Sequence, residues 1–436
     1  MLNKLKKITL GYCGLIFVLA ACSSSSSFSS ADSGQRPQTI STKILEATPI
    51  KIDLADLPQP FATESASNSP KVIPVPDQPT LNVPQGFAVN VFADNLPDVR
   101  WMALTPEGDI LAVQSKQNRI VRLHDQNQDG VAETKHIFAD QTNGLDQPLG
   151  MSFAGGSFYV ANTGAVLKFD YQPKQLKLDN KGQEITQLTP GGYNQHWTRN
   201  IVTSPNQKQL YISVGSASNV EPESLPRASI QVINLDGSQR FTYASGLRNP
   251  VGLDFHPITE ELFSTVNERD LLGDDLVPDY FTQVNQNGFY GWPYAYLNPD
   301  LLDPRRMQKQ QSERPDLAAK TITPDVLFQA HSAALGLQFY DHQKFPVKYQ
   351  NGAFVAFRGS WNRNEGTGYK IVFVPFSKDH QPLGYYEDFL TGFLVDANVP
   401  STFARPVGLL VLPDGSLLLA EDGNGRIYRI SYERNS

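Results

Sequence analysis

The sequence predicts an all-β fold, a six-bladed β-propeller of four-stranded antiparallel blades, over residues 84–432. Three observations support this prediction: strand–turn–strand patterns recur along the chain, the turns of the first four lie about 50 residues apart, and no long apolar stripe has helical periodicity. A blade needs a repeat of this length, because each twisted sheet buries its faces only against neighbouring blades. The alternative is an open pair of packed sheets in which the spacing is a coincidence.

The chain begins with the pattern of an export signal. Three lysines precede a mostly apolar run over residues 8–20, which is too short to cross a bilayer core of ~30 Å. The run ends in Leu-Ala-Ala-Cys, which resembles a bacterial lipobox, so we predict that residues 1–21 are a lipoprotein signal peptide and that Cys22 is lipidated. The serines after Cys22 favour a periplasmic protein anchored to the outer membrane of a two-membrane cell. A plain signal peptide or an uncleaved anchor is the alternative.

Residues 22–83 are rich in Ser and Pro and contain few aromatic residues. Such a stretch cannot bury enough apolar surface to offset its ordering entropy. We therefore expect a tether between the lipid and the folded domain, with the apolar patch over residues 50–57 packed on the domain as an extended strap.

The propeller prediction depends on six hairpins, each with two short apolar strands joined by a turn that contains Pro, Gly or Asp. They span residues 102–113, 151–160, 201–214, 253–264, 337–356 and 409–420. The spacing grows after the fourth hairpin, so residues 268–335 and 360–405 are expected to be long irregular insertions. Long loops in a compact domain are commonly functional, and we expect the site on the face from which both emerge.

Composition and motifs exclude several functions. The formal net charge of −7 argues against general nucleic-acid binding, which needs a surplus of Lys and Arg. The two cysteines, Cys13 and Cys22, leave no disulfide once the signal is removed. The sequence contains no HExxH, no GxSxG, no Cys-containing zinc motif and no phosphate-binding Gly loop before a helix, so zinc, serine-triad and nucleotide chemistry lack their usual motifs.

Polar loops at the ends of the hairpins carry the candidate catalytic residues. His196 lies directly before the third hairpin and could accept a substrate proton; the alternative is a His that only bonds a neighbouring loop. Arg248 and Asn249 lie before the fourth hairpin, and Arg358 and Arg405 lie at equivalent ends of the next two. Unpaired arginines at one end of a ring would repel one another, so we expect an anionic ligand between them.

These loops together resemble the soluble PQQ-dependent glucose dehydrogenases and their sorbosone dehydrogenase relatives, which are six-bladed propellers that oxidise aldoses with pyrroloquinoline quinone (PQQ). The resemblance covers residues 84–432. Its most specific segments are His196-Trp-Thr-Arg, Tyr211-Ile-Ser-Val-Gly-Ser, Gly246-Leu-Arg-Asn-Pro-Val-Gly, Tyr290-Gly-Trp-Pro, Arg358-Gly-Ser-Trp and Arg405-Pro-Val-Gly.

The resemblance implies a role for each candidate residue. His196 resembles the base that takes the anomeric hydroxyl proton while hydride passes to the quinone, and Arg248 the group that stabilises negative charge on the reducing quinone. The expected cofactor contacts are Asn249, Arg358, Arg405, Gln147 and Trp361. The family also binds Ca²⁺ through backbone carbonyls, for which the alignment of hairpins offers Asn267 and Glu268.

Two departures from the family pattern favour its sorbosone-type branch. Gln195 stands where the family has an acid before its catalytic His, and Asn267-Glu268 stands where the family has Gly-Pro. A separate calcium loop is suggested by Asp125, Asn127 and Asp129, which occupy the first, third and fifth places of such a loop, although the twelfth is a histidine. A plain hairpin turn would also use these residues.

The sequence therefore predicts a lipid-anchored dehydrogenase that oxidises a sugar or sugar aldehyde with PQQ and Ca²⁺ and passes electrons to a quinone or a cytochrome. Two rivals remain open. One is a calcium-dependent lactonase, for which only Glu421 and Asp422 offer acids near the last hairpin. The other is a catalytically silent propeller that binds a glycan or a protein partner.

Overall fold

The structure is a computed structural model and describes residues 38–190 and 196–433. Cys22 and Gln195 lie outside the described residues. All described residues belong to one unit, Asp32–Ser436. Strands dominate this unit, and its longest α-helix, α1 (Pro315–Ala318), has four residues. No helix among the described residues has the length and apolar character needed to cross a bilayer.

The first three large sheets follow one another along the chain. The first contains β6 (Val99–Leu104), β7 (Ile110–Gln114), β8 (Arg119–His124) and β9 (Thr134–Ala139). The second contains β10 (Met151–Ala154), β11 (Ser157–Ala161), β12 (Ala165–Asp170) and β13 (Gln183–Gln187). The third contains β14 (Ile201–Thr203), β15 (Gln209–Val214), β16 (Ser229–Asn234) and β17 (Phe241–Ser245). Consecutive strands in each sheet pair antiparallel. The third sheet gains β21 (Gly288–Phe289), which runs parallel to β17.

The next two large sheets draw strands from the segments that we expected to be insertions. They are β18 (Asn249–Phe255), β19 (Leu262–Asn267), β20 (Tyr280–Gln283) and β24 (Val326–Leu327), then β25 (Ala334–Phe339), β26 (Ala353–Phe357), β27 (Lys370–Val374) and β28 (Tyr386–Leu390). The prediction of irregular insertions over 268–335 and 360–405 is therefore wrong in part. The intervening loops hold β21, α1, a 3-10 helix (Pro304–Arg306) and two short strand pairs: β22 (Met307–Gln308) with β23 (Gln311–Ser312), and β29 (Leu394–Asp396) with β30 (Ser401–Thr402).

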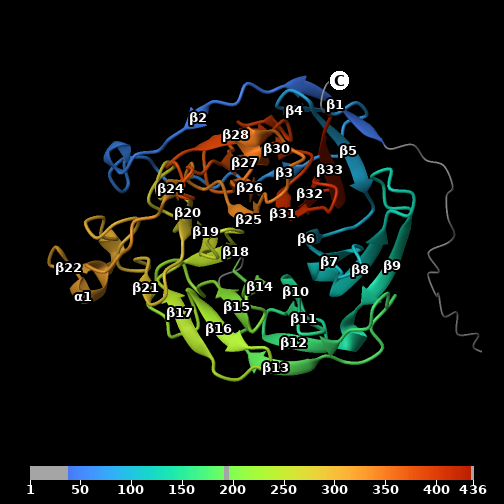
Figure 1. Cartoon of the computed structure of the whole chain (residues 1–436). Helices are drawn as coiled ribbons and strands as arrows, with labels where there is room; N and C mark the ends of the chain where they lie inside the picture. Colours follow the sequence, from blue (N-terminus) through green and yellow to red (C-terminus); the bar gives the residue numbers. More distant parts are fainter. Residues whose placement is uncertain (1–37, 191–195, 434–436) are drawn as a thin grey trace, which may run out of the picture. The chain divides into compact units, whose positions relative to one another are not determined.

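The last large sheet joins both ends of the described chain. It contains β31 (Pro406–Val411), β32 (Leu417–Glu421) and β33 (Arg426–Tyr432), and β33 pairs antiparallel with β5 (Phe87–Ala93). Figure 1 shows the large sheets around a common centre, with β6, β10, β14, β18, β25 and β31 nearest to it. This is the arrangement of a β-propeller, and all six predicted hairpins are confirmed as the first two strands of these sheets.

Apolar side chains between neighbouring sheets form the core. One cluster joins Leu111 and Phe138 of the first large sheet to Phe158 and Leu167 of the second. Another joins Phe92 and Leu418 of the last sheet to Met102 and Ala112 of the first. Because the twisted sheets cover each other in this way, the inner strands are held at fixed positions and their ends can carry a site.

The segment before the propeller is not a tether over its described part. β1 (Thr39–Ile44) pairs with β4 (Thr80–Val83) and β5, β2 (Pro49–Ile50) pairs with β28, and β3 (Lys71–Val72) pairs with β30. The tether prediction is wrong here because the strands find partners far away in the sequence. The predicted strap is confirmed: Ile50, Ile52, Leu54 and Leu57 pack against apolar clusters of the propeller. We call residues 38–83 the N-terminal arm.

Candidate active site

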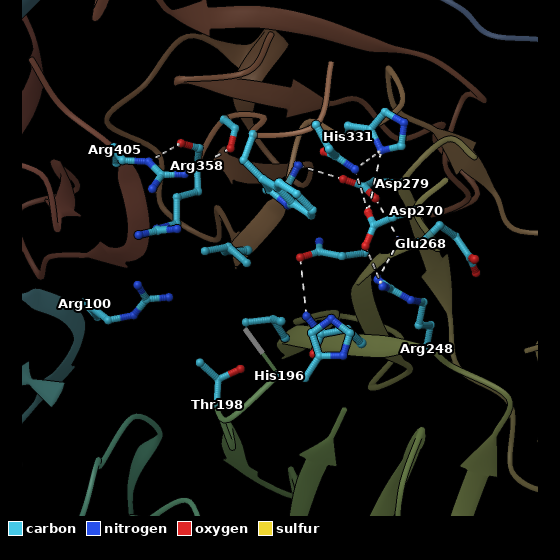
Figure 2. A pocket seen from close by; sticks show the side chains of 18 residues that line it. Arg100, His196, Thr198, Arg248, Glu268, Asp270, Asp279, His331, Arg358 and Arg405 are labelled. Atoms are coloured by element: carbon cyan, nitrogen blue, oxygen red, sulfur yellow. Dashed lines mark hydrogen bonds and ion pairs between the residues drawn. The ribbon is translucent and has the colours of Figure 1, made fainter. Parts of the chain in front are cut away.

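A cavity lies at one end of the inner strands and is lined by residues of several sheets (Figure 2). About 70 Å³ of it can hold the centres of water-sized spheres, and the whole space free of protein atoms, part of it open to solvent, is about 650 Å³. Its wall brings together eight of the residues predicted from the sequence: His196, Arg248, Asn249, Asn267, Glu268, Arg358, Trp361 and Arg405. Gln147 is exposed and is not part of the wall, so its predicted place beside a cofactor has no support in the structure.

His196 is delivered by the loop that enters β14 and is only 3% exposed. Its Nδ1 lies 3.0 Å from Oγ of Ser216 and 3.2 Å from the carbonyl oxygen of Ser216. The Ser216 hydroxyl donates its hydrogen to the carbonyl of Ser218 at 2.6 Å, so both Ser216 oxygens act as acceptors towards the ring. The hydrogen of neutral His196 therefore sits on Nδ1, and the lone pair sits on Nε2.

The environment of His196 keeps the ring neutral. Burial, followed by the positive charge of Arg248, holds the pKa of His196 well below its usual value of 6.5. Gly215 makes room beside the ring: a Cβ at that position would lie 2.3 Å from Oδ1 of Asn249 and 3.1 Å from Cβ of His196. A neutral imidazole can accept a proton at pH 7, so the geometry fits a general base.

Arg248 is fixed in the cavity wall by a dense set of hydrogen bonds. It donates to the backbone oxygen of Glu268 at 2.5 Å, to Oδ1 of Asn219 at 3.0 Å and to Oδ2 of Asp270 at 2.9 Å. Asp270 also accepts from Nδ2 of Asn362 at 2.7 Å, and the same Nδ2 lies 3.1 Å from Nδ1 of His331. The planar guanidinium is thus held in one orientation with its charge balanced by a carboxylate.

The facing wall carries an excess of positive charge. Arg100, Arg358 and Arg405 lie together in Figure 2, and Arg100 and Arg358 share the carboxylate of Asp422. Arg358 binds both carboxylate oxygens of Asp422 at 3.0 and 3.1 Å, and Arg100 also binds this carboxylate. Burial opposes ionisation of Asp422, but Arg358, Arg100 and Arg405 hold its pKa at about 2. The prediction of unpaired arginines is therefore wrong in part, because Asp422 pairs with Arg100 and Arg358. With three arginines and one carboxylate, the cluster still has more cations than anions.

Arg405 has the least compensation in this cluster. Its guanidinium donates to the carbonyls of Arg358 at 3.4 Å and Gly359 at 3.2 Å. Burial and the neighbouring Arg358 lower the pKa of Arg405 to about 9. The lowered pKa means that the surroundings destabilise the charged form of Arg405. A carboxylate placed beside Arg405 would relieve this cost, so the wall suits an anionic ligand.

Unpaired polar atoms in the cavity wall give an independent sign of a polar ligand. Oδ1 of Asn249, Oγ1 of Thr198 and Nε of Arg100 are buried and have no hydrogen-bond partner among the described residues. Buried polar groups are normally paired, so such atoms call for a partner from a ligand or water. The donors on Thr198 and Arg100, together with Arg358 and Arg405 in the same wall, therefore fit a ligand with carboxylates, such as PQQ.

The predicted calcium ligands Asn267 and Glu268 lie in the same wall but have other partners. The backbone oxygen of Glu268 accepts from Arg248, and Nδ2 of Asn267 donates to the carbonyl of Ala334 at 2.6 Å. A carbonyl has two lone pairs, so the Glu268 oxygen keeps one for a cation. The unpaired Oδ1 of Asn249 beside Asn267 is a further oxygen of the kind that Ca²⁺ takes.

The predicted peripheral calcium loop lies between β8 and β9, away from the cavity wall. Asp125, Asp129 and Glu133 place carboxylate oxygens within 4.8 Å of one another, and the backbone N of Asp129 donates to Oδ1 of Asn127 at 2.8 Å. The sequence pattern did not single out Glu133. Burial, followed by Glu133 and Asp129, raises the pKa of Asp125.

Several site residues were not found from the sequence. Asp270 and Asp279 lie in the loop between β19 and β20, His331 lies between β24 and β25, Asn362 lies between β26 and β27, and Arg100 lies in β6. No motif marked them, because their roles arise from contacts across large sequence separations. The N-terminal arm also reaches the site: Asn68 donates through its backbone N to the carbonyl of Trp361 at 2.8 Å and through Nδ2 to the carbonyl of Asn364 at 2.7 Å.

Replacing Asp422 with alanine should destabilise the protein strongly, because it leaves buried arginines without their acid. Breaking a buried ion pair from one side costs about 3–5 kcal/mol, so the chemical-denaturation midpoint should fall clearly. The control is Asp316→Ala, which removes the partner of Arg314 in an exposed ion pair. This change should leave the denaturation midpoint unchanged. Because the pKa of Asp422 is depressed in the fold, its contribution should be lost only as the pH falls through roughly 4 to 2. Equal midpoints for the two variants would refute this account.

Comparison with known proteins relates the chain to sugar-oxidising enzymes. A protein-family model described as TrAA12-like matches residues 81–285 and 278–433. A protein of Borreliella burgdorferi named only as uncharacterized is 29% identical over 367 residues, which cover 81% of this chain and 92% of that protein. A PQQ-dependent pyranose dehydrogenase of Coprinopsis cinerea is 25% identical over 414 residues, which cover 80% of this chain and 54% of the enzyme. The chain thus spans about half the length of that enzyme.

Solved structures support the same relation at the level of fold. A family AA12 carbohydrate-active enzyme of Trichoderma reesei superposes with a TM-score of 0.71 at 20% identity, covering 83% of this chain and 99% of that one. The holo form of the pyranose dehydrogenase PQQ domain of Coprinopsis cinerea superposes with a TM-score of 0.67 at 22% identity, covering 82% of this chain and 98% of that one. At these identities the likeness shows the shared fold.

Proposed function

Because the chain belongs to the TrAA12-like family, we propose that it is a PQQ-dependent sugar dehydrogenase, with the large sheets forming six blades of a closed propeller. Its relatives named for an activity are PQQ-dependent sugar oxidoreductases that act on CH–OH groups. The observation that carries the proposal is the cavity itself, where a buried neutral histidine faces a wall of arginines. That combination joins a base for a sugar hydroxyl to an anion-binding surface.

His196 is the proposed base. Its Nδ1 is engaged by Ser216, so Nε2 is the atom that takes the proton of the substrate hydroxyl. Arg248, held by Asp270 and Asn219, stabilises negative charge that develops in the cavity. Neither residue must reorganise during the reaction, because both are fixed by hydrogen bonds in the resting structure.

The arginine wall is the proposed cofactor site. Arg100, Arg358 and Arg405 would bind carboxylates of PQQ, and Asn249, Thr198 and Trp361 would contact its edges and face. When bound, PQQ supplies a two-electron acceptor, so that a sugar C–H and O–H are oxidised without a nicotinamide. The electrons would then leave to a quinone or a cytochrome.

Calcium has two proposed places. The first is beside Asn267 and Glu268 in the cavity, where backbone and amide oxygens are available. The second is the peripheral loop with Asp125, Asn127 and Asp129, to which the structure adds Glu133. A Ca²⁺ ion at the first place would be part of the cofactor site. A Ca²⁺ ion at the second place would stabilise the loop between β8 and β9.

The lactonase alternative loses its candidate ligands. The Asp422 carboxylate is occupied by Arg100 and Arg358. The Glu421 carboxylate accepts backbone N–H groups of Arg405, Gly423, Asn424 and Arg426. Neither acid is part of the cavity wall. The other alternative is a catalytically silent propeller that binds a glycan or a protein partner. The absence of sugar oxidation in the assay below would favour it.

We propose an aldose or a sorbosone-like sugar as substrate, and a periplasmic protein held at the outer membrane by a lipid on Cys22. Mass spectrometry of the membrane-extracted protein tests the anchor: a diacylglycerol adduct on a chain beginning at Cys22 is expected, and an unmodified Cys22 would contradict it.

The assay of the proposed function uses the protein loaded with PQQ and Ca²⁺. With an artificial electron acceptor, aldoses or sorbosone-like aldehydes should give PQQ-dependent reduction of the acceptor, whereas protein without PQQ should give none. Addition of a chelator should lower the rate if Ca²⁺ contributes. PQQ binding without turnover on any sugar or related alcohol would favour the silent binding module.

A further inference from the structure

The loop that carries His196 contains a buried arginine with no part in the cavity wall. Arg199 is 1% exposed, although an arginine is seldom fully buried unless it is paired. Its NH1 donates to the carbonyls of His196 at 2.9 Å and Thr198 at 2.8 Å, and its NH2 donates to the carbonyl of Thr189 at 3.0 Å. One guanidinium thus ties the stretch that follows β13 to the stretch that enters β14.

We propose that Arg199 is the positioning residue of His196: it fixes the backbone on which the base is mounted and places a positive charge behind the base. This inference rests on the proposed function, because it assigns His196 the role of base. Arg199 would not touch the substrate or the cofactor, since it is absent from the cavity wall.

The geometry explains why an arginine is needed. The fork of the guanidinium reaches carbonyls on two separate stretches at once, whereas a lysine ammonium is a point charge on a flexible stem. Among residues 38–190 and 196–433, no carboxylate forms an ion pair with Arg199, and the intervening Gly-Gly-Tyr-Asn-Gln sequence contains no acid. The buried charge is therefore offset by carbonyl dipoles that belong to the loop of the base, which couples its burial to the shape of that loop.

The charge of Arg199 also bears on the protonation of His196. Burial is the main cause of the lowered pKa of His196, and Arg248, Arg199 and Arg227 lower it further. These arginines come from three different loops, so the ring faces positive charge from several sides. The other charged or titratable groups across the cavity are Arg100, Glu268, Asp270, Asp279, His331, Arg358 and Arg405. Removing Arg199 should therefore raise the pKa of His196.

The test compares Arg199→Met and Arg199→Lys with the wild type in the full chain. In the protein without PQQ, NMR of the His196 ring nitrogens gives its tautomer and pKa; in the loaded protein, kcat and KM are measured against pH. Methionine should raise the His196 pKa, shift the acid limb of kcat to higher pH and lower kcat by about 10- to 100-fold with KM changed less than about twofold. Lysine should lower kcat but move the pKa less, because it keeps a positive charge.

The control is Arg122→Met, which removes another buried arginine that pairs with Asp109 and lies outside this loop. It should destabilise the protein without moving the His196 pKa or the acid limb. Variants of Arg199 that fold and keep the wild-type His196 pKa, tautomer and kcat would overturn the inference. If methionine prevents folding, the lysine variant decides the question by the same readouts. If the wild type oxidises no sugar, the proposed function fails, but the NMR measurement still tests whether Arg199 positions His196.

Discussion

Replacing His196 with alanine is expected to abolish sugar oxidation while the protein still binds PQQ. General bases contribute about 10²- to 10⁴-fold to a rate, so kcat should fall by at least that lower factor. The arginine wall is formed by other loops, so the PQQ dissociation constant should change little. Steady-state kinetics and a PQQ titration on the same preparation check both halves of this expectation.

The matched control for this experiment is His124→Ala. His124 is half exposed, pairs with Asp109 and is not part of the cavity wall, so its loss should leave kcat unchanged. A His196→Ala protein that keeps a third or more of the wild-type kcat would contradict the assignment of the base. Parallel loss of PQQ binding would mean that His196 serves the cofactor site instead.

The pH profile should report the same histidine. His196 acts as a base only when neutral, and burial with the charge of Arg248 holds its pKa well below 6.5. The acid limb of kcat should therefore lie below pH 6.5, and kcat should be flat from pH 6.5 to neutrality. An acid limb centred above pH 6.5 that persists in His196→Ala would assign the limb to another group.

The second large effect is expected for Arg405→Met, which should weaken PQQ binding without weakening the fold. A hydrogen bond to a charged group is worth about 1.5–3 kcal/mol, and about 1.4 kcal/mol corresponds to a factor of ten, so the dissociation constant should rise by about 10- to 100-fold. Arg405 has carbonyl partners, and burial lowers its pKa to about 9. Removing this strained charge should therefore leave the unfolding midpoint of the protein without PQQ unchanged or higher.

The control is Arg240→Met, at a guanidinium outside the cavity wall that donates to the carbonyl of Gln187. It should change neither PQQ affinity nor its salt dependence, whereas loss of Arg405 should reduce the salt dependence. An Arg405→Met protein with wild-type PQQ affinity would show that the arginine wall does not bind the cofactor carboxylates.

The fold was largely predictable because its signals are local. Five of the six hairpins combine apolar strands with a turn residue inside about a dozen positions, so the pattern can be recognised without knowledge of distant partners. The strands of the N-terminal arm lack this property. β1 pairs with β4 about 40 positions away and with β5 about 50 positions away, and its Ser- and Pro-rich neighbourhood looks like a tether until the partner strands are known.

The candidate site was predictable to the extent that single loops carry it. His196, Arg248, Arg358 and Arg405 each lie at a hairpin end, and the ring brings such ends together. Their acidic partners were not predictable: Asp422 lies 64 residues from Arg358, and no local pattern relates them. For the same reason the sequence suggested unpaired arginines, whereas the structure balances them in part with Asp270 and Asp422.

The central claim is that the arginine-lined cavity binds PQQ, and a spectroscopic titration of the purified protein with PQQ in the presence of Ca²⁺ tests it most directly. We expect saturable binding of one PQQ per chain, with a changed quinone absorption spectrum and an affinity that falls in Arg405→Met but not in His196→Ala. No binding by the folded wild type, or equal binding by Arg405→Met, would contradict the account.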